Sequence, residues 1–568
     1  MNLPTLPDTL REQHSGKGWP LALVGSLLLL VSGLLSWSFD PSILGDISIA
    51  FWPASLQLFA MILGAVGVLL ALMHRGPLHR LGDWFDTALG LRALGTGSLL
   101  FVVFSLVAIA SEAGGLVNVN PGGWLALAGA LLLTVGARFV PQRQLNSFAK
   151  AKANPVLEIV VIVLGMAAIL FGAAYVLGRD DPWIFVGFLV MAAVAFMALA
   201  RAGFFTWMSH VAQRHRHVLT LAAFVVAFLF PFTQDGSDAN MSIATQVLIF
   251  AATAIGLNIV VGLAGLLDLG YIAFLGSGAY VGAMMSNAAS ATIGWKPPFI
   301  VVMLIGACVA ATLGLIIGSP TLRVSGDYLA IVTLAFGEIF RLSMFNLDGN
   351  NGPDLTNGPN GIPGIPDLNL FGFDFGKPHT VFGIQLGRFS NYYFILLLLI
   401  GFIILVFTRL NNSRIGRGWV AIREDERAAE AMGVNTFGLK LLGFAVGAFL
   451  AGLAGTIKAH QDTAASPDQY IFLESAFLLA AVVLGGMGTV AGVLIGATIL
   501  KLLPEKLRFF SEYRLLLFGL LLVIMMRVRP EGLIASKRRQ LEFHEDDEEL
   551  AQEVQADHLI DAAPEAAR

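Results

Sequence analysis

The chain has 568 residues, of which 56% are hydrophobic and 13% are charged, and its formal net charge is -4. Soluble proteins are about 45–50% apolar and about 25% charged, so this composition excludes a protein that water covers over most of its surface. The lack of a basic tract argues against a nucleic-acid partner, and the single cysteine, Cys308, excludes an intrachain disulfide.

Uninterrupted apolar runs indicate that the chain crosses a membrane as helices. The runs at 21–35, 156–177 and 515–526 lack the alternation of apolar and polar residues that is typical of strands in a membrane barrel. Within a bilayer every backbone N–H and C=O needs an internal partner, which a helix supplies. The sequence therefore predicts an all-α polytopic membrane protein surrounded by lipid.

About sixteen segments approach the roughly 20 apolar residues that a transmembrane helix needs. Six form an N-terminal extension over 20–210, and ten fall in a second region over 217–535. The predicted spans lie near 20–39, 49–73, 89–111, 122–140, 156–178, 183–205, 217–234, 241–266, 269–289, 298–318, 325–345, 391–409, 437–459, 471–487, 488–504 and 513–529.

Clusters of Lys and Arg predict the orientation, because short loops that carry them stay on the cytoplasmic side. Such clusters follow the second, fourth, sixth, twelfth and last predicted spans, and one group at 501–508 runs against this pattern. We therefore expect the N-terminus (1–19) and a flexible acidic tail (540–568) in the cytoplasm. The segment 346–390 then lies on the opposite side, where its many Gly, Pro, Asn and Asp residues predict an ordered loop of successive turns.

The first segment that points to function is the glycine-rich run at 256–282, which reads GLNIVVGLAGLLDLGYIAFLGSGAYVG. Two hypotheses explain it: a packing interface in which helices approach closely, or a broken helix that lines a transport path. The candidate path residues are Asn258, Gly262, Gly265, Asp268, Gly270, Tyr271, Gly276 and Gly278.

Two charged residues, Glu338 and Arg341, are spaced i, i+3 within the predicted span at 325–345. On a helix this spacing allows an ion pair, which lowers the cost of placing charge near a membrane. The alternative is a role in gating or in contact with a binding protein.

The strongest functional signal is the predicted cytoplasmic segment at 417–435, RGWVAIREDERAAEAMGVN. Trp419, Ile422, Ala429 and Met432 recur at helical spacing, which predicts one short helix with an apolar stripe. Gly433 is placed to end that helix in a left-handed conformation, and Asn435 or Thr436 to cap the next one. A compact amphipathic helix of this kind is suited to fill a groove on a cytosolic partner.

This segment resembles the EAA loop of ABC-importer permeases, which docks on the ATPase. Ala428, Ala429 and Gly433 match the motif, while Glu426 is displaced by one position from the expected glutamate, where Arg427 stands instead. The resemblance implies that ATPase coupling involves Arg417, Trp419, Ile422, Arg423, Glu426, Ala428, Ala429, Met432 and Gly433.

Together with 257–283, 333–341 and 355–366, the segment is similar to the M-type subunits of the branched-chain amino-acid permease family, over roughly 217–535. The resemblance implies an ABC permease core in a bacterial inner membrane. It also implies a second, H-type permease subunit, two cytosolic ATPase subunits and a periplasmic amino-acid-binding protein. The task of residues 1–210 does not follow from it.

No GxxxxGK[ST] run occurs, so the chain has no phosphate-binding loop of its own, and we expect ATP hydrolysis on separate chains and no cofactor. Several functions remain open. An ABC permease for urea, amides or other amino acids would share the same architecture. An ion-coupled secondary transporter would use Glu338, Asp268 or Glu158 as a titrating group. A membrane scaffold would use the cytoplasmic helix only to recruit a partner.

Overall fold

The structure is a computed structural model. It describes residues 8–38, 55–82, 84–142, 154–178, 182–234, 236–321, 328–350, 352–381 and 383–506, with isolated positions from 516 to 534. The chain forms two compact units, Met1–Gln234 and Asp235–Arg568, so the helix predicted over 217–234 belongs to the first. The acidic tail at 540–568 lies outside the described residues.

Among the described residues, eleven helices are long and apolar enough to cross a membrane, and three shorter apolar helices accompany them. The chain is therefore an all-helical, multi-pass membrane protein, as the apolar runs predicted. Each of the first fifteen predicted spans falls on a helix, whereas 513–529 lies mostly outside the described residues. The count of sixteen spans is not confirmed, because several of these helices are shorter than a bilayer requires.

The first unit contains a bundle and a smaller helical cluster. Its helices are α1 (Asp8–Ser32), α2 (Ser55–His74), α3 (His79–Gly82), α4 (Thr87–Glu112), α5 (Pro121–Phe139), α6 (Pro155–Leu177), α7 (Pro182–Arg201), α8 (Phe204–Arg214) and α9 (Arg216–Leu229). Helices α1, α2, α4, α5 and α7 share one core, whereas α6, α8 and α9 enclose a second around Trp207 and Val211. Glycines allow the close approach of α1 and α5, since a Cβ on Gly25 would stand 2.4 Å from the Leu133 nitrogen.

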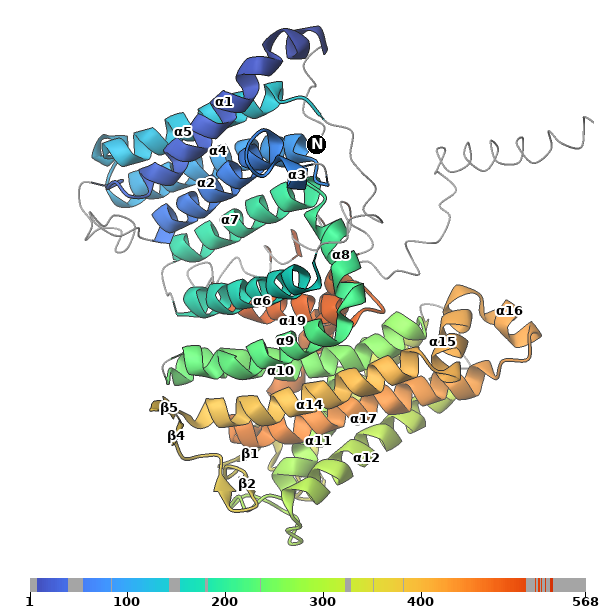
Figure 1. The fold of residues 1–568 in the computed structure, drawn as a ribbon. Helices are drawn as coiled ribbons and strands as arrows, with labels where there is room; N and C mark the ends of the chain where they lie inside the picture. The colour runs from blue at the N-terminus through green and yellow to red at the C-terminus, as the bar shows by residue number, and fades with distance from the viewer. Residues whose placement is uncertain are drawn as a thin grey trace, which may run out of the picture. The chain divides into compact units, whose positions relative to one another are not determined.

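The second unit is a bundle around one long central helix (Figure 1). Its helices are α10 (Asp238–Asn258), the π-helix η5 (Ile259–Leu263), α11 (Ile272–Met284), α12 (Phe299–Thr321), α13 (Tyr328–Asn346), α14 (Arg388–Asn411), α15 (Arg414–Glu424), α16 (Glu426–Ala431), α17 (Thr436–Asp462), α18 (Phe472–Gly485) and α19 (Val490–Lys506). Helix α17 packs against α10, α11, α12, α14 and α15. It can do so because its glycines and alanines leave room for neighbouring backbones.

Short strands order the loop between α13 and α14, as its turn residues predicted. Strand β2 (Asn369–Leu370) pairs with β3 (Phe373–Asp374), and β4 (His379–Val381) pairs with β5 (Ile384–Leu386), all antiparallel. Strand β1 (Ile362–Pro363) pairs with β6 (Ala464–Ala465), which follows α17. The loop is thereby fastened to one end of α17, which we call the hairpin end; α15 and α16 lie at the other, the polar-helix end (Figure 1).

Candidate functional site

The helix that begins at Asp238 is broken in the middle of the glycine-rich run. Helix α10 widens into the π-helix at Ile259–Leu263, and regular helix resumes only at Ile272 in α11. Gly265 adopts φ = +71°, a left-handed conformation that favours glycine over any residue with a Cβ. The broken-helix hypothesis for this run is confirmed in its geometry. A π-helix of this kind is common at functional sites.

The side chain of Asn258, at the start of the break, bonds the backbone of a distant turn. Asn258 is fully buried; its Oδ1 accepts from the Gly488 nitrogen at 2.8 Å, and its Nδ2 donates to the Thr489 carbonyl at 3.2 Å. A Cβ on Gly262 would stand 2.0 Å from Asn258 Oδ1. Only glycine at position 262 therefore leaves room for the amide that fastens the break to the turn between α18 and α19.

Side chains accept hydrogen bonds from the backbone beyond the π-helix, in place of the carbonyls that a continuous helix would have supplied. The Leu269 nitrogen donates to Thr333 Oγ1 and the Ile272 nitrogen to Ser475 Oγ, each at 3.0 Å. The buried carboxylate of Asp268 accepts from the Gly270 nitrogen at 2.9 Å, and the Tyr271 hydroxyl donates to the Gly447 carbonyl at 2.6 Å. Irregular backbone at membrane depth persists only where protein or water satisfies it, and protein side chains satisfy these three backbone nitrogens.

Three other glycines of the run serve close packing. A Cβ on Gly270 would stand 1.9 Å from the Thr333 carbonyl oxygen, and a Cβ on Gly278 would stand 2.2 Å from the Gly452 carbonyl oxygen. At Gly276 it would stand 2.6 Å from the Phe340 ring. The packing hypothesis therefore describes these three positions, whereas Gly265 belongs to the break itself.

At the polar-helix end, the predicted single helix over 417–435 is wrong, because two short helices replace it. Asp425 lies between them with extended backbone (φ −154°, ψ 109°) and caps α16 by accepting from the Arg427 nitrogen at 2.9 Å and the Ala428 nitrogen at 3.0 Å. Aspartate favours such a cap over the interior of a helix. Ser413 caps α15 in the same way, through the Gly416 nitrogen at 3.2 Å.

The predicted apolar stripe is also corrected, because most of it faces the protein's own bundle. Trp419 is fully buried and donates from Nε1 to the Leu439 carbonyl of α17 at 2.6 Å. Ile422 and Ala429 are buried as well, whereas Met432 is 85% exposed. The stripe seats the segment on α17 and leaves Met432 on the exposed side, together with Arg417, Arg427 and Ala428.

The segment ends as predicted. Gly433 has φ = +82°, and its nitrogen donates to the Glu430 carbonyl at 2.9 Å. Asn435 then caps α17 by accepting from the Gly438 nitrogen at 2.9 Å. Glu426 forms an ion pair with Lys440 of α17, which adds a second attachment beside Trp419.

Arg423 connects this segment to the broken helix, a contact that the sequence did not predict. Its Nη1 donates to the Gly262 carbonyl at 3.0 Å across 161 residues of chain, and its guanidinium also pairs with Glu424 at 2.6 Å. The two predicted clusters, at 256–282 and 417–435, are thus one connected site at the polar-helix end of the second unit.

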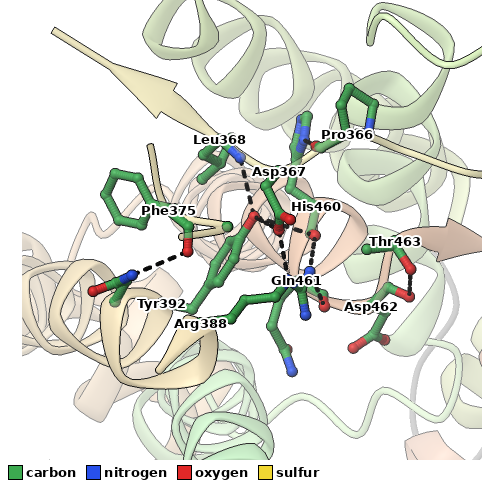
Figure 2. Close-up of polar contacts among 12 residues, drawn as sticks. Pro366, Asp367, Leu368, Phe375, Arg388, Tyr392, His460, Gln461, Asp462 and Thr463 are labelled. Carbon is green, nitrogen blue, oxygen red and sulfur yellow. Dashed lines mark hydrogen bonds and ion pairs between the residues drawn. The ribbon is translucent and has the colours of Figure 1, made fainter. Parts of the chain in front are cut away.

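A polar cluster at the hairpin end was also missed (Figure 2). Arg388, the first residue of α14, lies 2.7 Å from the Asp367 carboxylate and donates to the carbonyls of His460 at 3.0 Å and Gln461 at 2.9 Å. Tyr392 donates to Asp367 at 3.0 Å. Arg388 thereby ties the loop to the last turn of α17. The sequence signal for this cluster was Arg388 itself, an arginine at the start of an apolar span, next to a loop predicted to lie on the side poor in Lys and Arg.

Glu338 and Arg341 form an ion pair on α13, at 2.5 Å. Arg341 also lies 3.8 Å from Asp468, just beyond the end of α17. On the exposed loop nearby in sequence, Lys377 lies 3.1 Å from Asp374 and lowers the pKa of that carboxyl below its ordinary value.

A cavity of about 560 Å³ lies among α12, α14, α17 and the β2–β3 hairpin. Asn391 is the polar residue of its lining, and the Asn391 amide donates to the Phe375 and Lys377 carbonyls at 3.1 and 2.9 Å. A zwitterionic ligand needs polar partners, because an unpaired charge is costly in an apolar environment. This cavity is therefore unsuited to a free amino acid.

Comparisons with known proteins identify the class. Residues 240–526 match the family model described as "Branched-chain amino acid transport system / permease component". The chain is 37% identical over 387 residues to the high-affinity branched-chain amino acid transport system permease protein LivM of Salmonella typhimurium and of Escherichia coli, covering 64% of this chain and 87% of each relative. It is 27% identical over 312 residues to the ribose import permease protein RbsC of Haemophilus influenzae, covering 53% of this chain and 87% of that protein. No solved structure matches.

These matches define a transport permease subunit rather than an enzyme. The chain belongs to the branched-chain amino acid transport system permease family.

Proposed function

We propose that this chain is the M-type permease subunit of an ATP-driven importer for branched-chain amino acids in a bacterial inner membrane. The similarity to LivM over 87% of its length supports the substrate class. The observation that carries the mechanism is the α15–α16 segment, which is seated on α17 by Trp419 and hydrogen-bonded to the broken helix by Arg423. A mobile partner held on this segment would act directly on the transport path.

The segment is assigned to the cytoplasm because of its charge. Arg414, Arg417, Arg423 and Arg427 all follow α14 within a short connection, and basic residues of short loops are retained on the cytoplasmic side. The hairpin end then faces the periplasm, where a binding protein would deliver substrate. Both termini are placed in the cytoplasm by the same rule.

The exposed side of the segment is proposed to dock an ATPase. Met432, Ala428 and Arg427 offer an apolar centre beside a positive charge, and methionine adapts its shape to a partner surface. The chain has no phosphate-binding loop of its own, so two separate ATPases would supply the energy. An H-type permease subunit would complete the transporter, in line with the 31% identity over 128 residues to LivH of Escherichia coli.

The break between α10 and α11 is proposed to line the path. Asn258, Gly262, Gly265, Asp268 and Tyr271 surround backbone that is not part of a regular α-helix. Polar groups of such backbone can replace water around the charged ends of an amino acid. Alternating access would then be a rearrangement of the two half-helices when the ATPases close.

A second candidate is an ion-coupled transporter, favoured by the surroundings of Asp268. Glu158 is paired with Arg214 at 2.7 Å and with His215 at 3.0 Å, and Glu338 is paired with Arg341. Among the described residues, no Lys, Arg or His forms an ion pair with the buried Asp268. Leucine accumulation by the purified permease on a proton gradient, without ATPases, would establish this candidate.

The test of the main proposal is reconstitution of the complex purified from native membranes. In proteoliposomes we expect leucine uptake that requires ATP and the binding protein. Met432→Glu should reduce ATPase capture in a pull-down more than tenfold, while Val117→Glu, at a residue that is 89% exposed in the first unit, should leave it unchanged. Normal capture and uptake with Met432→Glu would exclude the docking surface.

A further inference from the structure

The π-helix leaves one backbone carbonyl without its helical partner, and a side chain from another segment takes that place. In a continuing α-helix the Gly262 carbonyl would accept from the Leu266 nitrogen. Here the Leu266 nitrogen donates instead to the Val260 carbonyl at 3.0 Å, and Arg423 Nη1 donates to Gly262 at 3.0 Å. A cation at a helix C-terminus also interacts favourably with the helix dipole.

The aliphatic part of Arg423 packs on the same break. A Cβ on Gly265 would stand 2.5 Å from Arg423 Cγ and 3.1 Å from its Cβ, so the absence of a side chain at Gly265 creates the seat for this arginine. The guanidinium is held further by Glu424 at 2.6 Å. Arg423 therefore contacts the break through two independent parts of its side chain.

The residue one turn earlier fixes α15 to a different helix. Trp419 donates to the Leu439 carbonyl of α17 at 2.6 Å, whereas Arg423, four residues later, contacts η5 and the break. Asn258 at the start of the π-helix is bonded to the α18–α19 turn. A rotation of α15 about its Trp419 attachment would therefore move the Gly262 carbonyl through Arg423, while Asn258 keeps the start of the π-helix bonded to the α18–α19 turn.

We propose that Arg423 is the positioning residue that passes movement of the α15–α16 segment to the broken helix, rather than a residue that docks the ATPase. This inference rests on the proposed function. It separates two roles within one segment: Met432 and Arg427 face outward for a partner, and Arg423 faces inward to the transport path. Loss of the Arg423 contact leaves docking intact and breaks the coupling between hydrolysis and transport.

The test compares two arginines of the same segment in the reconstituted complex. Arg423→Met keeps the aliphatic stem and removes the donor, and we expect ATPase capture and ATP hydrolysis within twofold of the wild type but leucine transported per ATP reduced at least tenfold. Arg423→Lys should recover part of that ratio, because an ammonium can still donate to the carbonyl. The matched control Arg427→Met should lower capture and leave the ratio unchanged.

Gly265→Ala is the second variant, since its methyl group displaces the Arg423 stem without removing a charge. It should lower the ratio of leucine to ATP as Arg423→Met does. Because Gly265 has φ = +71°, the methyl group also strains the backbone of the break, so the decisive outcome for this variant is an unchanged ratio, which overturns the inference even if Arg423→Met is not recovered as a folded complex. An unchanged ratio, or a loss of ATPase capture with Arg423→Met, overturns the inference. If the wild-type complex shows no ATP-dependent uptake, the proposed function fails instead, which is a separate outcome.

Discussion

The amide of Asn258 bonds both the Gly488 nitrogen and the Thr489 carbonyl, and so closes the break in one helix against the turn between two others. Asn258 and Gly488 are 230 residues apart in sequence; Asn258 is fully buried, and Gly488 and Thr489 are half-buried. This relationship makes the α18–α19 turn part of the candidate transport path, although that turn has no charged residue to mark it.

Asn258→Ala should destabilise the second unit. It leaves the Gly488 N–H and the Thr489 carbonyl, which belong to two half-buried residues, without their partner. An unpaired buried polar group costs about 1–3 kcal/mol. We expect a lower thermal midpoint of the detergent-solubilised permease and a fall in leucine uptake. The control is Asn346→Ala, since Asn346 is exposed and its amide donates to the Leu342 carbonyl of its own helix; equal midpoints for both variants would contradict the prediction.

Trp419→Ala should release the α15–α16 segment from α17. Truncation of a buried Trp costs about 3–5 kcal/mol, and the bond to the Leu439 carbonyl is lost as well. We expect trypsin to cleave at Arg414 or Arg417 in the folded permease at least tenfold faster. Trp295→Ala, at a position that is 60% exposed, should leave the cleavage rate unchanged. Equal protection of both variants would show that Trp419 does not seat the segment.

Gly278→Ala should push α11 and α17 apart, since the added methyl would meet the Gly452 carbonyl oxygen at 2.2 Å. Overpacking of this kind costs about 1–3 kcal/mol. Differential scanning fluorimetry should record a lower midpoint than for Gly294→Ala, where the methyl group meets nothing within 4 Å. A midpoint at or above that of the control would count against close contact of the two helices.

Arg388→Met should loosen the loop at the hairpin end (Figure 2). The substitution leaves the Asp367 carboxylate and the carbonyls of His460 and Gln461 without their shared donor. Limited proteolysis within 346–390 should accelerate, and adding Asp367→Asn should cause little further change, because residues in one network are not additive. Additive effects of the two substitutions would indicate separate roles.

Much of the helical architecture could be predicted because apolar runs and their interruptions are local. Gly433 and Asn435 were predicted correctly, since a left-handed terminator and a helix cap depend on adjacent residues. The break at Asp425 was missed, although a cap residue within a polar run is a visible signal. Periodicity placed Trp419 and Ile422 on one face but could not say whether that face meets a partner or the protein's own α17.

Long-range contacts could not be predicted. Arg423 meets Gly262 across 161 residues, and Arg388 meets His460 across 72, and neither pairing has a local pattern. Fixed spacing found the pairing partners Glu338 and Arg341 because they share one helix. The exact number of membrane crossings depends on helix lengths, which glycine-rich boundaries leave poorly defined in sequence.

The most direct test of the central claim is cross-linking at Met432 in native membranes. In a Cys308→Ala background, Met432→Cys is the single thiol of the chain and lies on the exposed side of the α15–α16 segment. A thiol-specific cross-linker should join it to an ATPase subunit, and an impermeant thiol reagent should reach it only after the membrane is opened to the cytoplasmic side. Labelling of this cysteine from outside intact cells, with no ATPase adduct, would contradict the account.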